Sequence, residues 1–257
     1  MSYIDNLNKI FKNLNEKNTD LIIVISSFHK SFVEYRSIDK IEVIKSIFNF
    51  LKEKTYNKML LMYPAFTHSF AKSGIFNVKK TRPEQMGALP LLAFKDDDFY
   101  RTLSPINSFL VWPKDIKLEK KFIYSTFGNH SIFDWMTSKK CRIICLGDIS
   151  DTQNGWIGAH HSEQICKVPY RYYKKFSGKI IDRNHSVFNH TQYHFARIEK
   201  LNIKNDFSFL NKKLREKNMI DEIYSDQLNI STVWLNDVIK ISNQIIKKDP
   251  YGLTNFK

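Results

Sequence analysis

The segment DLIIVISS, Asp20–Ser27, decides the fold, because it is an almost unbroken apolar run of strand length. Residues 37–54 follow it with apolar side chains at helical spacing, and KMLLMYP, Lys58–Pro64, is a second apolar run. Such runs are typical of strands covered on both faces, and strand, helix and strand in succession build a parallel sheet. The sequence therefore predicts an α/β fold around this unit.

The same pattern continues toward the C-terminus. CRIICLGD, Cys141–Asp148, predicts another buried strand, and Thr232–Lys248 has the apolar periodicity of a long closing helix that ends before Pro250. No internal repeat and no linker-like stretch is visible. We predict a single α/β domain over residues 1–257, with a central mixed or mostly parallel sheet flanked by helices.

Composition narrows the class of protein. The 257 residues carry a formal net charge of +14, yet no dense Lys/Arg block or nucleic-acid-binding motif is present. A basic surface favours anionic small molecules, so we expect no nucleic acid partner. No apolar run is long enough to cross a membrane. Three cysteines show no zinc-like or disulfide pattern, which indicates a reducing cytoplasm.

One pair of residues stands out chemically. In WIGAHHSEQICKVPYR, residues 156–171, His160 and Glu163 are three residues apart. If a helix starts here, the imidazole and the carboxylate share one face. Histidine titrates near neutral pH, so such a pair is suited to binding or deprotonating an amine. The spacing alone also occurs by chance on the polar faces of ordinary helices.

Loops after predicted strands are further candidates. MYPAFTHSF, residues 62–70, follows the second strand, where α/β proteins bind ligands. In YRTLSPINSFLVW, residues 100–112, Arg101 stands beside Thr102 and Ser104, a group suited to a phosphate or carboxylate. An ion pair between Arg101 and the acidic run at residues 96–98 is the alternative.

Five segments, in order, resemble the aminoglycoside 3-N-acetyltransferase family over roughly residues 20–175. The family has a P-x-F-T-x-S-F-like loop, a T-P-S-x-M-G-x-L segment, an R-S-x-H-P-x-x-S segment, a glycine-serine turn, and L-H-x-A-E followed by Y-R. The corresponding segments here are Pro64–Phe70, Pro83–Leu89 (PEQMGAL), Arg101–Ser108 (RTLSPINS), Phe127–Ser131 (FGNHS), and Ala159–Glu163 (AHHSE) with Tyr170-Arg171 downstream.

The resemblance implies the fold of that family, distinct from the GNAT fold, and direct acetyl transfer from acetyl-CoA to an amine without a metal. It implies His160 as the general base, Glu163 as the residue that orients the imidazole or holds the ammonium, and Thr67 with backbone N–H groups as the oxyanion site. The residues expected to contact acetyl-CoA are Phe66, Thr67, Ser69, Arg82, Met86, Gly87, Arg101 and Ser108. Cys141 and Cys145, in an apolar strand, are not expected to act as nucleophiles.

Departures from the family pattern concern the acceptor. Arg82-Pro83-Glu84 replaces Thr-Pro-Ser, and Ser104 replaces the histidine before Pro105. We therefore expect an amino-sugar acceptor, nucleotide-linked or a precursor of surface polysaccharide, with an aminoglycoside antibiotic as the alternative. Two other classes stay open. One is a metal-dependent hydrolase, since six of the eight histidines lie between His130 and His194; the other is a non-catalytic relative. Self-association into a homo-oligomer is left open as well.

Overall fold

The computed structural model describes residues 2–28, 37–84, 86–114, 123–147, 156–225 and 228–256, and no helix in these ranges is long and apolar enough to span a membrane. Gln85 of the PEQMGAL segment and Asp148, the last residue of the third predicted strand, lie outside the described residues.

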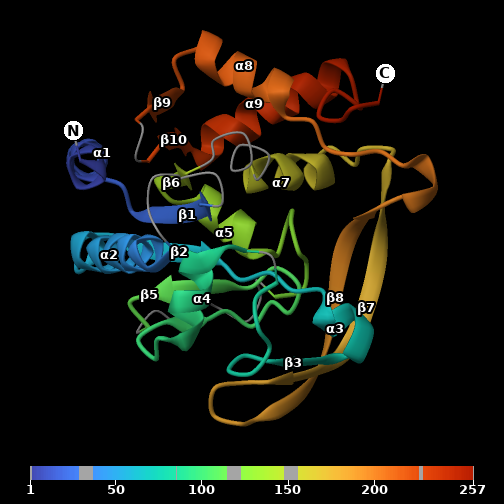
Figure 1. The fold of residues 1–257 in the computed structure, drawn as a ribbon. Helices are drawn as coiled ribbons and strands as arrows, with labels where there is room; N and C mark the ends of the chain where they lie inside the picture. Colours follow the sequence, from blue (N-terminus) through green and yellow to red (C-terminus); the bar gives the residue numbers. More distant parts are fainter. Residues whose placement is uncertain are drawn as a thin grey trace.

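A seven-stranded sheet runs through the described part of the chain, with the order β4-β5-β2-β1-β6-β10-β9 (Figure 1). β1 pairs in parallel with β2 on one side and with β6 on the other, as the strand-helix-strand unit predicts. The outer pairings are antiparallel, so the sheet is mixed rather than mostly parallel. The strands are β1 (Leu21–Ser27), β2 (Leu60–Pro64), β4 (Tyr100–Arg101), β5 (Phe109–Trp112), β6 (Cys141–Gly147), β9 (Ile220–Ile223) and β10 (Ile230–Trp234).

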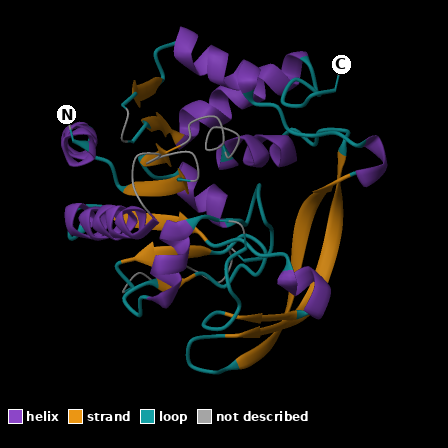
Figure 2. Ribbon diagram, in the orientation of Figure 1, coloured by secondary structure: helices purple, strands orange, loops and turns teal. Residues whose placement is uncertain are grey.

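Helices cover both faces of this sheet (Figure 2), which explains why β1 is apolar at nearly every position. Successive side chains of a strand point to opposite faces of the sheet. Leu21 and Ile23 therefore belong to the hydrophobic core on one face, and Ile22 and Val24 belong to the core on the other. The helices of the first core are α5 (Ile132–Thr137), α7 (Ile157–Ile165), α8 (Ser208–Glu216) and α9 (Leu235–Lys248). Those of the second are α1 (Tyr3–Glu16), α2 (Ser37–Thr55) and α4 (Ala88–Lys95).

The prediction of one helix over Thr232–Lys248 is wrong at its beginning. Thr232, Val233 and Trp234 belong to β10, and the helix α9 starts at Leu235. Val233 pairs with Ile143 of the buried strand β6, so pairing within the sheet overrides the local helical periodicity.

A long hairpin stands apart from the main sheet (Figure 1). Its strands β7 (Arg171–Ile181) and β8 (Val187–Arg197) pair along their full length, and β3 (Ile75–Asn77), which follows the short helix α3 (Ser69–Ser73), adds a third strand. The base of the hairpin directly follows α7, so Arg171 and its cross-strand partner Arg197 lie near that helix. The hairpin therefore forms one side of the region described next.

Candidate active site

A cavity of about 1020 Å³ lies at the carboxyl ends of β1 and β2. Its walls come mainly from the ends of those strands, the start of α4, the helix α7 and the base of the hairpin. Residues from these places that line it include Ser26, Ser27, Pro64, Phe66, Met86, Gly87, Ile157, His160, Arg171, Lys174, His194 and Arg197. The carboxyl ends of neighbouring parallel strands are the usual ligand-binding edge of an α/β sheet.

His160 and Glu163 both lie on α7, and the distance between Nδ1 of His160 and Oε2 of Glu163 is 2.6 Å. The Glu163 side chain is 0% exposed, whereas that of His160 is 21% exposed and lines the cavity. The rings of Phe127 and Phe207 flank the imidazole, with centroids at 5.5 and 5.6 Å. The helix therefore holds a carboxylate behind a histidine whose ring faces the cavity.

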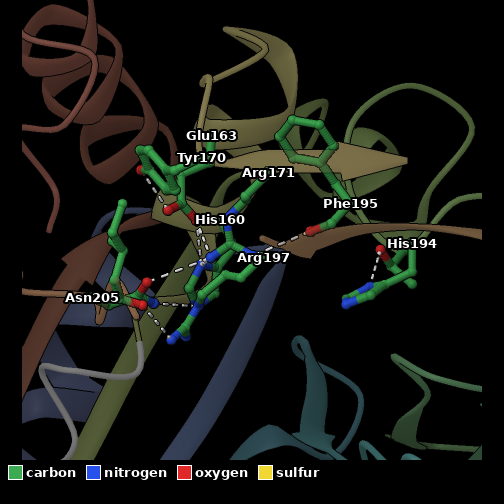
Figure 3. A network of polar contacts seen from close by, with 10 residues as sticks. His160, Glu163, Tyr170, Arg171, His194, Phe195, Arg197 and Asn205 are labelled. Atoms are coloured by element: carbon green, nitrogen blue, oxygen red, sulfur yellow. Dashed lines mark hydrogen bonds and ion pairs between the residues drawn. The ribbon is translucent and has the colours of Figure 1, made fainter. Parts of the chain in front are cut away.

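Glu163 is the centre of a buried network (Figure 3). The hydroxyl of Tyr170 donates to its Oε1 at 2.8 Å, and Nη2 of Arg171 lies 2.9 Å from its Oε2. Burial by itself raises the pKa of Glu163, but His160, Arg171 and Tyr170 together outweigh burial and hold the pKa below its ordinary value. Glu163 is thus a carboxylate near neutral pH. The Tyr-Arg dipeptide after the helix supplies the partners that keep it charged.

Asn205 fixes the other side of the imidazole, and no sequence pattern indicated this role. Its Oδ1 accepts from Nη2 of Arg171 at 3.5 Å, and its Nδ2 lies 3.3 Å from Nε2 of His160. Because the amide nitrogen is a donor, the nearby Nε2 must be an acceptor. This assigns the proton to Nδ1, where Glu163 accepts it, and leaves a lone pair on Nε2.

Three of the residues predicted to contact acetyl-CoA line the same cavity as His160: Phe66, Met86 and Gly87. Gly87 has φ +86°, and a Cβ there would lie 2.9 Å from the backbone oxygen of Ser26. Only glycine allows the chain to enter α4 so close to the end of β1. Phe66 lies in the loop after β2, and Met86 and Gly87 directly precede α4. The sequence pattern had indicated both this loop and this helix start.

Two other predicted contacts, Ser69 and Arg82, line a separate cavity of about 550 Å³ that also includes Glu84. The remaining three are buried behind the loop that follows β2. Thr67 donates its hydroxyl to Glu84 (2.8 Å) and its backbone N–H to Ile106 (3.1 Å), so neither donor points to a ligand.

Arg101 is 3% exposed and holds the loops together. Its Nε donates to Ser108 Oγ at 3.1 Å, its Nη2 to the Ala65 oxygen at 2.9 Å, and its Nη1 to the Thr81 oxygen. The hydroxyl of Ser108 donates to the same Ala65 oxygen at 2.7 Å. Burial lowers the pKa of Arg101 to about 9. Arg101 forms no ion pair with the acidic run at 96–98, where Asp96 and Asp98 pair with Lys52.

The histidines do not converge as a metal site in the part of the chain that is described. His190 Nε2 lies 3.1 Å from the Ile123 oxygen, and His194 Nδ1 lies 3.0 Å from Thr126 Oγ1. Among the described residues no three His, Cys, Asp or Glu side chains are grouped as metal ligands. His161, next to the candidate base, is buried, and its Nδ1 accepts the N–H of Gly128 at 3.2 Å.

Comparison with known proteins gives the family. The profile described as aminoglycoside 3-N-acetyltransferase matches residues 42–247, most of the chain. A search of curated proteins finds no significant match. Among solved structures, aminoglycoside acetyltransferase AAC(3)-Xa superposes with a TM-score of 0.70 at 12% identity, covering 96% of this chain and 93% of the other. AAC-VIa bound to sisomicin gives 0.69 at 11% identity (95% and 97%).

The YokD protein from Bacillus subtilis gives a TM-score of 0.66 at 14% identity, covering 93% of this chain and 90% of the other. At these identities the structures show a shared fold, and the profile match shows the family. The chain belongs to the aminoglycoside 3-N-acetyltransferase family and is a CoA-dependent N-acyltransferase that transfers an acetyl group to an amino group.

Proposed function

We propose that this enzyme transfers the acetyl group of acetyl-CoA directly to the amino group of an amino sugar, with His160 as the general base. One observation carries the proposal: Nδ1 of His160 contacts the buried carboxylate of Glu163 at 2.6 Å, while the ring borders the 1020 Å³ cavity. With Nδ1 protonated, Nε2 has the lone pair that a base needs, and the incoming amine takes the place of the Asn205 amide, which lies 3.3 Å from it.

The acceptor attacks as a neutral amine, after its ammonium group has lost one proton to solvent. Its nitrogen bonds to the carbonyl carbon of the thioester and must then lose a second proton, which Nε2 of His160 takes. The carbon–sulfur bond then breaks, and the proton passes from the imidazolium to the departing CoA thiolate. A base of suitable pKa contributes roughly 10²–10⁴-fold to the rate.

Glu163 orients the imidazole in this mechanism rather than binding the acceptor. Its Oε1 accepts from Tyr170, and its Oε2 is shared by His160 and Arg171. With its side chain 0% exposed, it has no face left for an incoming ammonium group.

For acetyl-CoA, we place the pantetheine arm along Phe66 and the Met86-Gly87 segment, beside His160. Thr67, Arg101 and Ser108 support the strand-end loop from behind, because their polar groups are taken by protein atoms. We assign no oxyanion contact to Thr67 for the same reason. Ser69 and Arg82 border the smaller cavity and would meet only a part of the cofactor that extends there.

For the acceptor, we propose an amino sugar that is nucleotide-linked or a precursor of surface polysaccharide. Arg82-Pro83-Glu84 and Ser104, where the family pattern differs, motivate this choice. An aminoglycoside antibiotic is the second candidate. It is favoured by the structural neighbours that hold sisomicin or, in a histidine-to-alanine variant of AAC(3)-IVa, a gentamicin or apramycin. We also propose a cytoplasmic location, since Cys141, Cys145 and Cys166 are not joined by disulfides within the described residues.

The test measures CoA release from acetyl-CoA with amino sugars and aminoglycosides side by side, for the wild type and for His160→Ala. We expect turnover by the wild type with at least one amine and a large loss in the variant. Wild-type protein that acetylates no amine would refute the proposal, and undiminished activity of the variant would refute the role of His160.

A further inference from the structure

The charged side chains that line the cavity beside His160 are mainly basic. Among the described residues, its fixed positive charges are Lys40, Arg171, Lys174 and Arg197, and its lining contains one carboxylate, Glu199. Aminoglycosides carry several ammonium groups, and a wall that binds them must supply carboxylates. The described part of this wall has the opposite sign.

The base of the hairpin brings like charges together. Arg171 and Arg197 are direct cross-strand partners, and Lys174 is the cross-strand partner of His194. Like charges in directly opposed positions destabilise a sheet unless something compensates them. The charge of Arg171 is compensated by an ion pair with Glu163, whose Oε2 lies 2.9 Å from Nη2 of the arginine. His194 stays neutral near pH 7, because burial first, and then Arg171 and other nearby positive groups, lower its pKa to about 4.

Arg197 and Lys174 form no ion pair within the described part of the chain, although the charge of Glu163 acts on Arg197 from a distance. One hydrogen bond is formed by the Arg197 guanidinium there, from Nη1 to the Ile203 oxygen at 3.4 Å. Lys174 Nζ lies 5.3 Å from the centre of the Phe176 ring, which also lines the cavity. Figure 3 shows Arg197 beside His160 and Arg171. Two cations are therefore left to interact with whatever enters next to the base.

These cations are poorly placed for the phosphates of CoA. The thioester must reach His160, and the long pantetheine arm then holds the CoA phosphates far from it. Arg171, by contrast, lies 3.4 Å from Nδ1 of His160, and Arg197 is its cross-strand partner. The molecule that meets the hairpin base is the one that presents its amine to His160.

We propose that the acceptor amine belongs to an anionic sugar, and that Arg197 and Lys174 bind its phosphate or carboxylate group. This inference rests on the proposed N-acetyl transfer at His160 and names the substrate class. A guanidinium binds a planar carboxylate or a phosphate through paired hydrogen bonds, and the ammonium of Lys174 adds a second positive charge. The same charges repel a polycationic aminoglycoside.

The experiment compares three acceptors with the same amino sugar: its phosphate ester or nucleotide-linked form, its acid with a carboxylate, and its uncharged methyl glycoside. For each, kcat/KM is measured with the wild type, Lys174→Gln, Arg197→Gln and the double variant. Lys175→Gln is the matched control, because Lys175 is the next residue of β7, faces away from Lys174 and does not line the cavity. Calorimetry measures binding of each acceptor in the presence of CoA, independently of turnover.

We expect the wild type to prefer a charged acceptor, and the ratio of kcat/KM for charged over uncharged acceptor to fall about 10- to 100-fold in the double variant. Lys175→Gln should keep the wild-type ratio, and the preference should weaken with added salt. The phosphate and carboxylate arms identify which anion is bound. A ratio that the double variant leaves unchanged, or one near unity in the wild type, would overturn the proposal.

Two further outcomes separate this inference from the proposed function. If Arg197→Gln and Lys174→Gln raise the KM for acetyl-CoA rather than for the acceptor, the cations serve the cofactor, and the acceptor inference fails while N-acetyl transfer stands. If anionic sugars bind with the expected preference but no amine is acetylated, the binding inference stands and the proposed reaction fails.

Discussion

The amide nitrogen of Asn205 lies 3.3 Å from Nε2 of His160, while Nδ1 of the same ring contacts Glu163 at 2.6 Å. The ring is thus held between a donor and a carboxylate, with one tautomer favoured. Nη2 of Arg171 also donates a hydrogen bond to Oδ1 of Asn205, at 3.5 Å. A residue in the loop before α8 therefore completes the surroundings of His160, the proposed base on α7.

Replacing Asn205 with aspartate is expected to shift the pH dependence of the enzyme. A carboxylate beside Nε2 favours the protonated ring, so the acidic limb of kcat/KM should move to higher pH. The measurement is a profile of kcat/KM against pH. Asn205→Ala is the control, since it removes the contact without adding charge. If the aspartate and alanine variants have the same acidic limb, the two groups do not interact in the enzyme.

Replacing His160 with alanine should lower kcat by roughly 10²–10⁴-fold, the usual contribution of a general base. The residue is part-exposed, but it hydrogen-bonds to the buried carboxylate of Glu163, so the free energy of unfolding should fall by about 1–3 kcal/mol while the variant stays folded. Steady-state kinetics and thermal unfolding followed by circular dichroism measure the two effects. His161→Ala, at the neighbouring buried position, should also lower stability, but with a much smaller catalytic loss. A fully active His160→Ala would remove this residue from the mechanism.

Glu163→Gln should reduce both activity and stability. It removes the carboxylate from Arg171, and breaking a buried ion pair costs about 3–5 kcal/mol of unfolding free energy. Because the neutral amide no longer fixes the tautomer of His160, we expect kcat to fall as well, by about 100-fold. Urea unfolding and single-turnover rates measure the two effects. Glu199→Gln, at the exposed carboxylate of the cavity wall, is the control, and a stability loss with unchanged kcat would limit Glu163 to a structural role.

Arg101→Lys separates two roles for this arginine. A lysine cannot reproduce hydrogen bonds to Ser108, Ala65 and Thr81 at once, so the free energy of unfolding should fall by roughly 1–3 kcal/mol. The KM for acetyl-CoA of the folded variant should change little by comparison. A large rise in that KM without loss of stability would instead support the phosphate contact that the sequence suggested for Arg101.

His161 should make stability depend on pH. Its pKa is lowered to about 4, mainly by burial, whereas an unfolded histidine titrates near 6.5. The unfolded chain therefore binds more protons between these values, and stability should be complete above pH 6.5 and decrease as the pH falls toward 4. This one group contributes on the order of 3 kcal/mol. Urea unfolding at several pH values should show a flatter dependence for His161→Asn, which keeps an acceptor for Gly128; an equal slope would contradict the assignment.

Much of the fold could be predicted because its signals are local. The apolar run of β1 reflects burial on both faces, and the three-residue spacing of His160 and Glu163 fixes their contact once α7 forms. β10 was missed because its pairing with β6 depends on a distant strand.

The rest of the site depends on partners that a sequence pattern does not reveal. Arg101 has the residue type for a phosphate contact, but carbonyl oxygens of two other loops already satisfy it. The hydroxyl of Thr67 likewise already has a protein partner, because it donates to the carboxylate of Glu84. Asn205 and Arg197 were overlooked because only the hairpin register and the packing of the loop before α8 bring them to His160.

The hairpin of β7 and β8 gives this enzyme two separable parts. The proposed base and its carboxylate are set in a helix packed on the central sheet, whereas the cations proposed to bind the acceptor stand on a ribbon outside that sheet. Lys174 and Arg197 are exposed there, so their substitution would change the proposed acceptor recognition while the buried contacts of Glu163 stay in place.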